Sequence, residues 1–265
     1  ELAMRANTEL GQDVLAALHR ARSMEESPIG VDILDRLIEN AKIAQREKIP
    51  ICQDTGMAVV FIEIGQNVHI TGGRLTEAIN EGVRRGYQDG YLRQSICDPI
   101  TRENTGDNTP AVIHLELVEG DRLTISLVAK GFGSENMSRV TMLPPSAGIN
   151  GVRDVVVERV AEAGPNPCPP TIVGVGIGGS MEKAALLAKK ALLRPLMTPN
   201  PDPELDRLET SWLKRINCLG IGPQGLGGRV TSLGVHINSS PTHIASIPVA
   251  VNLQCHASRH KTARL

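Results

Sequence analysis

The chain has 265 residues, enough for one large domain or two small ones, and its formal net charge is -1 at pH 7. This balance offers no basic surface to nucleic acid or to an anionic membrane, and an aromatic content of only 2% excludes a base-stacking platform. No apolar run reaches the roughly 20 residues of a membrane helix, and the first residues lack the pattern of a secretory signal, so we expect a cytoplasmic protein.

The first half of the chain begins with helical periodicity. Residues 8–47 predict two amphipathic helices. Residues 57–70 alternate and are rich in β-branched side chains, which predicts a pair of strands, and residues 75–92 predict a helix. Residues 111–129 predict a β-hairpin that turns at residues 119–121.

The second half interleaves helices, strands and glycine-rich loops. The predicted elements are a loop at 131–148, a helix at 149–163, a strand from 171, a helix from 181, a Pro-rich hinge, a helix near 203–217, a glycine-rich loop and strands to about 254. This order predicts an α/β fold that has mixed sheets, interleaved helices and an N-terminal helical segment. We expect residues 1–265 to form a single domain, with room for two subdomains.

A glycine motif marks the predicted strand at 171. Gly174, Gly176 and Gly179 spell G-x-G-x-x-G between a strand and a helix, as in dinucleotide-binding folds. No second parallel strand is predicted directly after that helix, and Asp202 lies in the hinge instead of at a strand end. The pattern therefore favours close backbone packing, with Ser180 as the helix N-cap.

Three of the five cysteines stand in unusual contexts. Cys52 and Cys255 lie at strand ends beside amide side chains, and Cys168 lies between two prolines, whereas Cys97 and Cys218 have contexts typical of buried cysteines. The spacings are too long for a local zinc or ferredoxin motif. Three thiolates that converged could hold a cubane iron-sulfur cluster with one open iron; the alternative is three unrelated buried cysteines.

Polar residues near these cysteines suit a dicarboxylate. Gln53 and Asp54 adjoin Cys52, Arg93 follows a predicted helix, and residues 103–110 and 131–136 contain turn amides that can bind an anion. The alternatives are a surface cation for Arg93 and turn chemistry for residues 104–109.

A histidine precedes the last of these cysteines by 12 positions. His243 is either a satisfied core histidine or a proton donor. Asp54 and His243 are both candidates for proton transfer.

Six ordered blocks, which together cover about residues 8–260, resemble the α subunit or N-terminal domain of class I fumarate hydratases and the related tartrate dehydratases. The blocks are CQDTG at 52–56, RENTGDNTPAVIH at 102–114, KGFGSENMS at 130–138, NPCPPTIVGVGIGGS at 166–180, GIGPQGLGG at 220–228 and HIASIPVAVNLQCH at 243–256.

The resemblance implies a cofactor and a site. A 4Fe-4S cluster is expected on Cys52, Cys168 and Cys255, with its open iron acting as a Lewis acid that eases loss of water. The residues expected to hold a small dicarboxylate substrate are Gln53, Asp54, Arg93, Gly133 and His243, of which Asp54 and His243 are the catalytic candidates.

The resemblance also implies a partner. The chain stops before the second domain of single-chain relatives, so we expect a separate β subunit, a hetero-oligomer and an active site between the two subunits. Residues 104–110 and 134–136 favour hydration of fumarate to malate; dehydration of tartrate is the near alternative. An iron-sulfur sensing or regulatory module is the alternative of another class.

Overall fold

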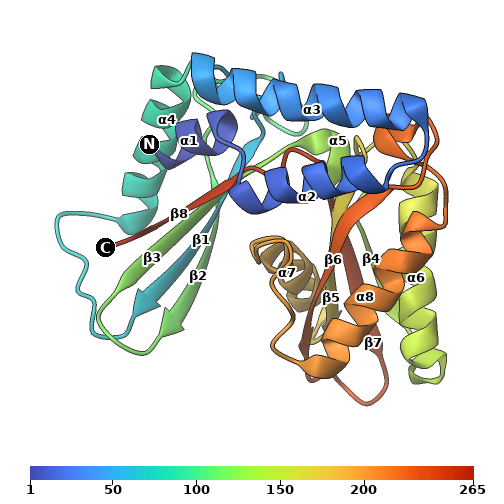
Figure 1. Cartoon of the computed structure of the whole chain (residues 1–265). Helices are drawn as coiled ribbons and strands as arrows, with labels where there is room; N and C mark the ends of the chain where they lie inside the picture. The colour runs from blue at the N-terminus through green and yellow to red at the C-terminus, as the bar shows by residue number, and fades with distance from the viewer. The chain divides into compact units, whose positions relative to one another are not determined.

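The computed structural model describes residues 1–265 and divides them into two compact units (Figure 1). The first unit contains Glu1–Gly11, Asn40–Phe132 and Arg259–Leu265, and the second contains Gln12–Glu39 and Gly133–Ser258. Both units combine helices with a mixed sheet, which confirms the predicted α/β class. None of the helices is long and apolar enough to span a membrane.

The first unit is built on a four-stranded sheet in the order β2-β1-β3-β8. Its elements are α1 (Leu2–Thr8), β1 (Met57–Gly65), α4 (Leu75–Asp89), β2 (Val112–Val118), β3 (Leu123–Lys130) and β8 (His260–Arg264). Strand β1 runs parallel to β2 and antiparallel to β3, and β3 runs antiparallel to β8. Buried side chains of β1 and β3 pack with Ala3 and Ala6 of α1 and with Val83 and Tyr87 of α4.

Two strand predictions for this unit are wrong. Residues 57–70 form one strand instead of a pair, and β2 and β3 do not form a hairpin because β1 lies between them. The cause is the composition of β1, whose residues from Ala58 to Ile62 are all buried. A strand that is apolar on both faces is suited to the centre of a sheet, where it accepts a neighbour on each side.

The second unit has a four-stranded sheet in the order β4-β7-β5-β6. Its elements are α2 (Gln12–Met24), α5 (Phe132–Glu135), β4 (Arg139–Leu143), α6 (Gly148–Ala163), β5 (Thr171–Gly178), α7 (Met181–Ala191), α8 (Pro203–Asn217), β6 (Ser232–Ser240) and β7 (Ile247–Gln254), with single 3-10 turns at Pro145–Ala147 and Pro223–Gly225. Helix α3 (Pro28–Glu47) crosses the boundary between the units along the chain. The expected loop at 131–148 contains a short helix and a strand, and the predicted helices at 149–163 and 203–217 are confirmed within one residue.

Helices cover both faces of the second sheet. Val156 of α6 and Trp212 of α8 pack with Val173 of β5 in the main core, whereas Ala184 and Ala188 of α7 pack on the opposite face. Valine and alanine fill these layers, as expected for a chain with so few aromatic residues.

The glycines of β5 let α7 approach the sheet closely. A Cβ atom at Gly174 would lie 2.2 Å from the Ala188 carbonyl oxygen, and one at Gly176 would lie 2.0 Å from that of Ala184. The parallel strand β6 follows only after both α7 and α8. Close backbone packing is therefore confirmed as the role of these glycines, while Ser180 occupies the N-cap position with its hydroxyl on the Glu182 carboxylate.

We predict that Gly176→Ala destabilises the protein. The added methyl group must push α7 off the sheet, which costs about 1–3 kcal/mol of the free energy of unfolding. Gly82→Ala in α4 is the matched control, because a Cβ there meets no atom within 4 Å and alanine favours a helix by about 0.5–1 kcal/mol. Urea unfolding of both variants measures the effect, and a Gly176→Ala protein as stable as the wild type would contradict the packing argument.

Candidate functional site

The first candidate site segment is the turn of residues 52–56, which precedes β1. The Tyr87 hydroxyl donates to the carbonyl oxygens of Thr55 and Gly56 at 3.0 and 2.9 Å, and Asn108 Nδ2 donates to the same Gly56 oxygen at 3.2 Å. Burial of its ring raises the pKa of Tyr87 well above its ordinary value. The phenol thus stays a donor, and the turn is held by side chains that come from distant parts of the first unit.

The turn brings together three of the predicted site residues, Cys52, Gln53 and Arg93. Cys52 Sγ lies 3.3 Å from the Gln53 Oε1, to which it donates. The Thr55 hydroxyl donates to the Arg93 carbonyl oxygen at 3.0 Å, which anchors the segment after α4 beside the turn. The side chains of Gln53 and Arg93 are exposed, so both can reach a ligand in solvent.

Asp54 has a fixed orientation. Its Oδ1 accepts from the Gly56 amide at 3.0 Å and its Oδ2 from the Phe132 amide at 2.8 Å. Arg259, only 1% exposed, donates through Nη1 to the Asp54 carbonyl oxygen and, at 3.2 Å, to Asn7 Oδ1. The buried guanidinium of Arg259 therefore supports the turn by a hydrogen bond to its backbone. No local sequence signal indicates this role, because 205 positions separate Arg259 from Asp54.

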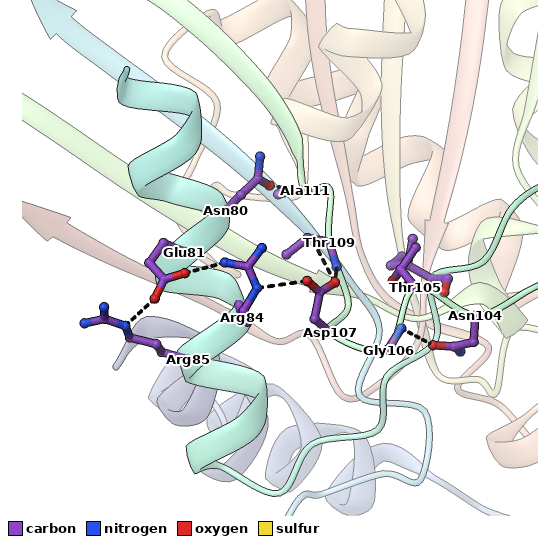
Figure 2. Close-up of polar contacts among 11 residues, drawn as sticks. Asn80, Glu81, Arg84, Arg85, Asn104, Thr105, Gly106, Asp107, Thr109 and Ala111 are labelled. Carbon is purple, nitrogen blue, oxygen red and sulfur yellow. Dashed lines mark hydrogen bonds and ion pairs between the residues drawn. The ribbon is translucent and has the colours of Figure 1, made fainter. Parts of the chain in front are cut away.

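The segment of residues 103–110 uses its polar side chains to build its own turns (Figure 2). Asp107 Oδ1 accepts from the Thr109 amide at 3.0 Å and its Oδ2 from Arg84 Nε at 2.9 Å, while Asn104 Oδ1 accepts from the Gly106 amide at 2.8 Å. Hydrogen bonds from Thr109, with a further one from Arg84, lower the pKa of Asp107 to about 2. The turn-chemistry alternative accounts for these side chains.

In the second unit, Cys168 and Cys255 lie at the same end of two neighbouring strands, β5 and β7. Ile172 pairs with Gln254, so the start of β5 and the end of β7 lie side by side. His256 Nδ1 donates to the Cys168 carbonyl oxygen at 3.1 Å. Gln224 donates to the Pro169 carbonyl oxygen through its side-chain amide at 2.9 Å and its backbone amide at 2.8 Å.

Gln224 and His256 are therefore contacts of the cysteine loops that sequence reasoning did not single out. The glycine-rich block around Gln224 was the sequence feature that could have indicated this contact. Gln224 has a positive φ of 52° and lies in a 3-10 turn, and this conformation brings its amide groups onto the Cys168 loop. None of the five cysteines forms a disulfide, and Cys218, expected to be buried, is exposed at the end of α8.

The end of the second sheet that carries Cys168 and Cys255 also carries a buried side-chain amide. The side chain of Gln254, next to Cys255, is 1% exposed, and both its amide atoms lack a hydrogen-bond partner. No group of three or more His, Cys, Asp or Glu side chains is arranged to hold a metal ion. Two soft thiol donors beside an orphaned amide fit the border of an iron-sulfur cluster better than an oxygen-ligated cation.

Gly133 and His243, the two remaining predicted site residues, lie at different ends of the second unit. A Cβ at Gly133 would lie 3.6 Å from the Asn166 carbonyl oxygen, which places Gly133 beside the Cys168 loop. His243 is exposed in the loop before β7, so the core-histidine alternative is wrong. The eight residues of β7 separate His243 from Cys255 by roughly 26 Å, so this unit does not bring the two together.

Glu25 anchors the glycine-rich loop that carries Gln224. Its carboxylate is 8% exposed and accepts from the backbone amides of Ser27 at 3.0 Å, Arg229 at 2.9 Å and Val230 at 2.9 Å, as well as from that of Glu26. Burial alone would raise the pKa of Glu25, but these amide hydrogen bonds outweigh it and hold the pKa below its ordinary value of 4.5.

Comparison with known proteins identifies the family. The family model described as "Fumarate hydratase (Fumerase)" matches residues 1–264. The chain therefore belongs to the fumarate hydratase family, as the six sequence blocks predicted.

Similar proteins share most of the length of the chain. A protein of Methanocaldococcus jannaschii named "Putative L(+)-tartrate dehydratase subunit alpha" is 43% identical over 272 residues, which cover 100% of this chain and 95% of that protein. The "L(+)-tartrate dehydratase subunit alpha" of Escherichia coli strain K12 is 35% identical over 260 residues, which cover 97% of this chain and 86% of that protein. The protein of the same name in Shigella sonnei shows the same identity and coverage.

We predict that Glu25→Gln lowers stability in a pH-dependent way. Because the folded-state pKa is depressed, the carboxylate contributes its full stabilisation above the unfolded-state value, and the contribution is lost as pH falls through the folded-state value. At neutral pH the variant should lose about 1–3 kcal/mol of the free energy of unfolding. Urea unfolding at neutral pH and below pH 4.5 should show the difference shrinking on acidification. Glu26→Gln, which alters the exposed neighbouring carboxylate that pairs with the Arg229 side chain, is the control and should lose less stability at neutral pH.

Proposed function

We propose that this chain is the α subunit of a two-subunit hydro-lyase that adds or removes water at a four-carbon dicarboxylate. The observation that carries the proposal is the match to the fumarate hydratase family over residues 1–264. The relatives are themselves named as α subunits, which supports a separate β subunit and a hetero-oligomer.

The cofactor of this proposal is a 4Fe-4S cluster ligated by Cys52, Cys168 and Cys255. When bound, such a cluster supplies a Lewis acid through the iron that has no protein ligand. Support comes from the adjacency of the Cys168 and Cys255 loops and from the orphaned amide of Gln254 beside them. Cys52 supplies a third, partly exposed thiol from the first unit.

The chain's own residues would bind and orient the substrate. Gln53 and Arg93 present an exposed amide and an exposed guanidinium beside the Cys52 turn, which suits the carboxylate groups of a dicarboxylate. Gly133 would add a backbone amide near the Cys168 loop. Asp54, whose two carboxylate oxygens each accept one backbone amide, keeps further lone pairs with which to take a proton at a fixed position.

His243 is the second candidate for proton transfer. At roughly 26 Å from Cys255 along β7, it cannot touch a group held by that cysteine of the same chain. A role for His243 in the proposed site therefore requires a second copy of the chain to supply it.

Two substrates have specific support. The family description favours fumarate, which is hydrated to malate, and the names of the relatives favour L(+)-tartrate, which is dehydrated. The test is to reconstitute the chain anaerobically with iron, sulfide and its β subunit, and then compare kcat/KM for malate and L(+)-tartrate. A clear preference identifies the substrate. A loaded complex that turns over neither acid contradicts the hydro-lyase proposal, and a cluster that responds only to iron or oxygen favours a sensing module.

The ligand assignment predicts that Cys168→Ser removes the cluster and the activity. A serine oxygen is a poor ligand for iron that prefers thiolate, so acid-labile sulfide per chain should fall several-fold after anaerobic reconstitution. Cys97→Ser and Cys218→Ser are the matched controls, and both should retain the cluster. Equal iron and sulfide in all three variants would remove Cys168 from the ligand set without deciding the reaction.

A further inference from the structure

Gln254, the last residue of β7, has a buried side-chain amide that no group of the chain pairs. The side chain is 1% exposed, and neither Nε2 nor Oε1 has a hydrogen-bond partner in the chain. An unpaired buried amide costs free energy, whereas an apolar side chain of similar size fills the same space at no such cost. A glutamine at this position is therefore better explained by contact with a bound group than by packing.

The neighbours of Gln254 along β7 show which face of the second sheet its side chain lies on. Val251 and Leu253 belong to the main core with α6 and α8, whereas Ala250 packs with α7 on the opposite face. Because side chains alternate along a strand, Gln254 lies on the same face as Ala250 and Asn252.

Asn252 shows what else borders this face. Its Nδ2 donates to the Glu135 carboxylate of α5 at 2.9 Å. The same short helix contains Gly133, which lies beside the Cys168 loop. The face that carries Gln254 is therefore bordered by two segments of the candidate site, α5 and the Cys168 loop.

Two other side-chain donors at this end of the sheet already have acceptors. His256 Nδ1 donates to the Cys168 carbonyl oxygen at 3.1 Å, and Gln224 Nε2 donates to the Pro169 carbonyl oxygen at 2.9 Å. Both bonds hold the backbone of the Cys168 loop. Of these three side chains, Gln254 is the one whose donor group has no acceptor in the chain, and its NH2 group has two hydrogens to donate.

We propose that Gln254 Nε2 donates a hydrogen bond to a sulfur of the iron-sulfur cluster, an inference that rests on the proposed function. Gln254 directly precedes Cys255 and pairs with Ile172, which closely follows Cys168, so both thiols assigned as ligands lie at its end of the sheet. Hydrogen bonds to cluster sulfurs help to set the reduction potential. Because donation stabilises negative charge on sulfur, this bond raises the potential and slows loss of the cluster.

The test compares the wild type with Gln254→Met, which keeps the length of the side chain and removes its polar atoms. In the full chain without cofactor, the variant should have a higher urea midpoint, because no amide is left buried and unpaired. After anaerobic reconstitution with the β subunit, it should lose iron and sulfide to a chelator about tenfold faster than the wild type and have a lower reduction potential. A structural role would instead lower stability in both states. Gln254→Leu carries the same expectations and replaces the methionine variant if that variant fails to fold.

Asn200→Leu is the matched control, because it also removes a buried amide of the second unit, but one that is paired. Asn200 is 7% exposed, and its Nδ2 donates to the Glu209 carboxylate at 2.6 Å and to the Ile237 carbonyl oxygen at 2.9 Å. This variant should have a lower urea midpoint and should keep the wild-type resistance to the chelator.

A Gln254→Met protein that keeps the cluster and the potential of the wild type would overturn the inference and leave the hydro-lyase proposal intact. A cofactor-free variant as destabilised as Asn200→Leu would also overturn it. So would a variant in which only KM for malate or L(+)-tartrate rises, because the amide would then contact the substrate. A wild-type complex that takes up no iron or sulfide would contradict the proposed cofactor itself, and this inference with it.

Discussion

The carboxylate of Glu25 satisfies four backbone amides at once, and the glycine-rich loop beside Cys168 depends on it. Loops that carry candidate site residues cannot use a helix or a sheet ladder for their buried polar groups, so a side chain must supply the partner. Glu25 does so from the junction of α2 and α3, more than 200 positions from Arg229. The loop is thereby fixed to an element that contributes no chemistry of its own.

In the first unit, neutral side chains supply the hydrogen-bond partners of backbone groups that no helix or sheet pairs. Tyr87 donates to the carbonyl oxygens of Thr55 and Gly56, Asn108 donates to that of Gly56, and Gly56 leaves no room for a side chain against the backbone of Lys130. Buried polar groups that are fully paired rigidify a structure, whereas unpaired ones are costly. Asp54 and Arg93 are consequently presented by a rigid turn, as a binding site requires if its geometry is to be set before the ligand arrives.

The sequence predicted correctly those elements whose conformation depends on residues close to one another in the chain. Helical periodicity located α6 and α8, and the proline neighbours of Cys168 identified an irregular loop at a strand end. It failed where the determinant is a pairing between distant segments, since an alternating run of residues does not say which strand will lie beside it. Arg259 was missed for the same reason, because its partner Asp54 lies in a different part of the chain and no motif joins them.

The separation of His243 from Cys255 shows that the distance between two residues depends on the conformation of the segment between them as well as on its length. Twelve residues that include a whole β-strand span far more than the same number in a helix, which rises only about 1.5 Å per residue. The second unit accordingly carries its candidate residues at two ends, with the thiols and Gln254 at one and the exposed histidine at the other. Any mechanism that assigns both ends to one reaction must therefore use more than one copy of this unit, so assembly becomes part of the chemistry.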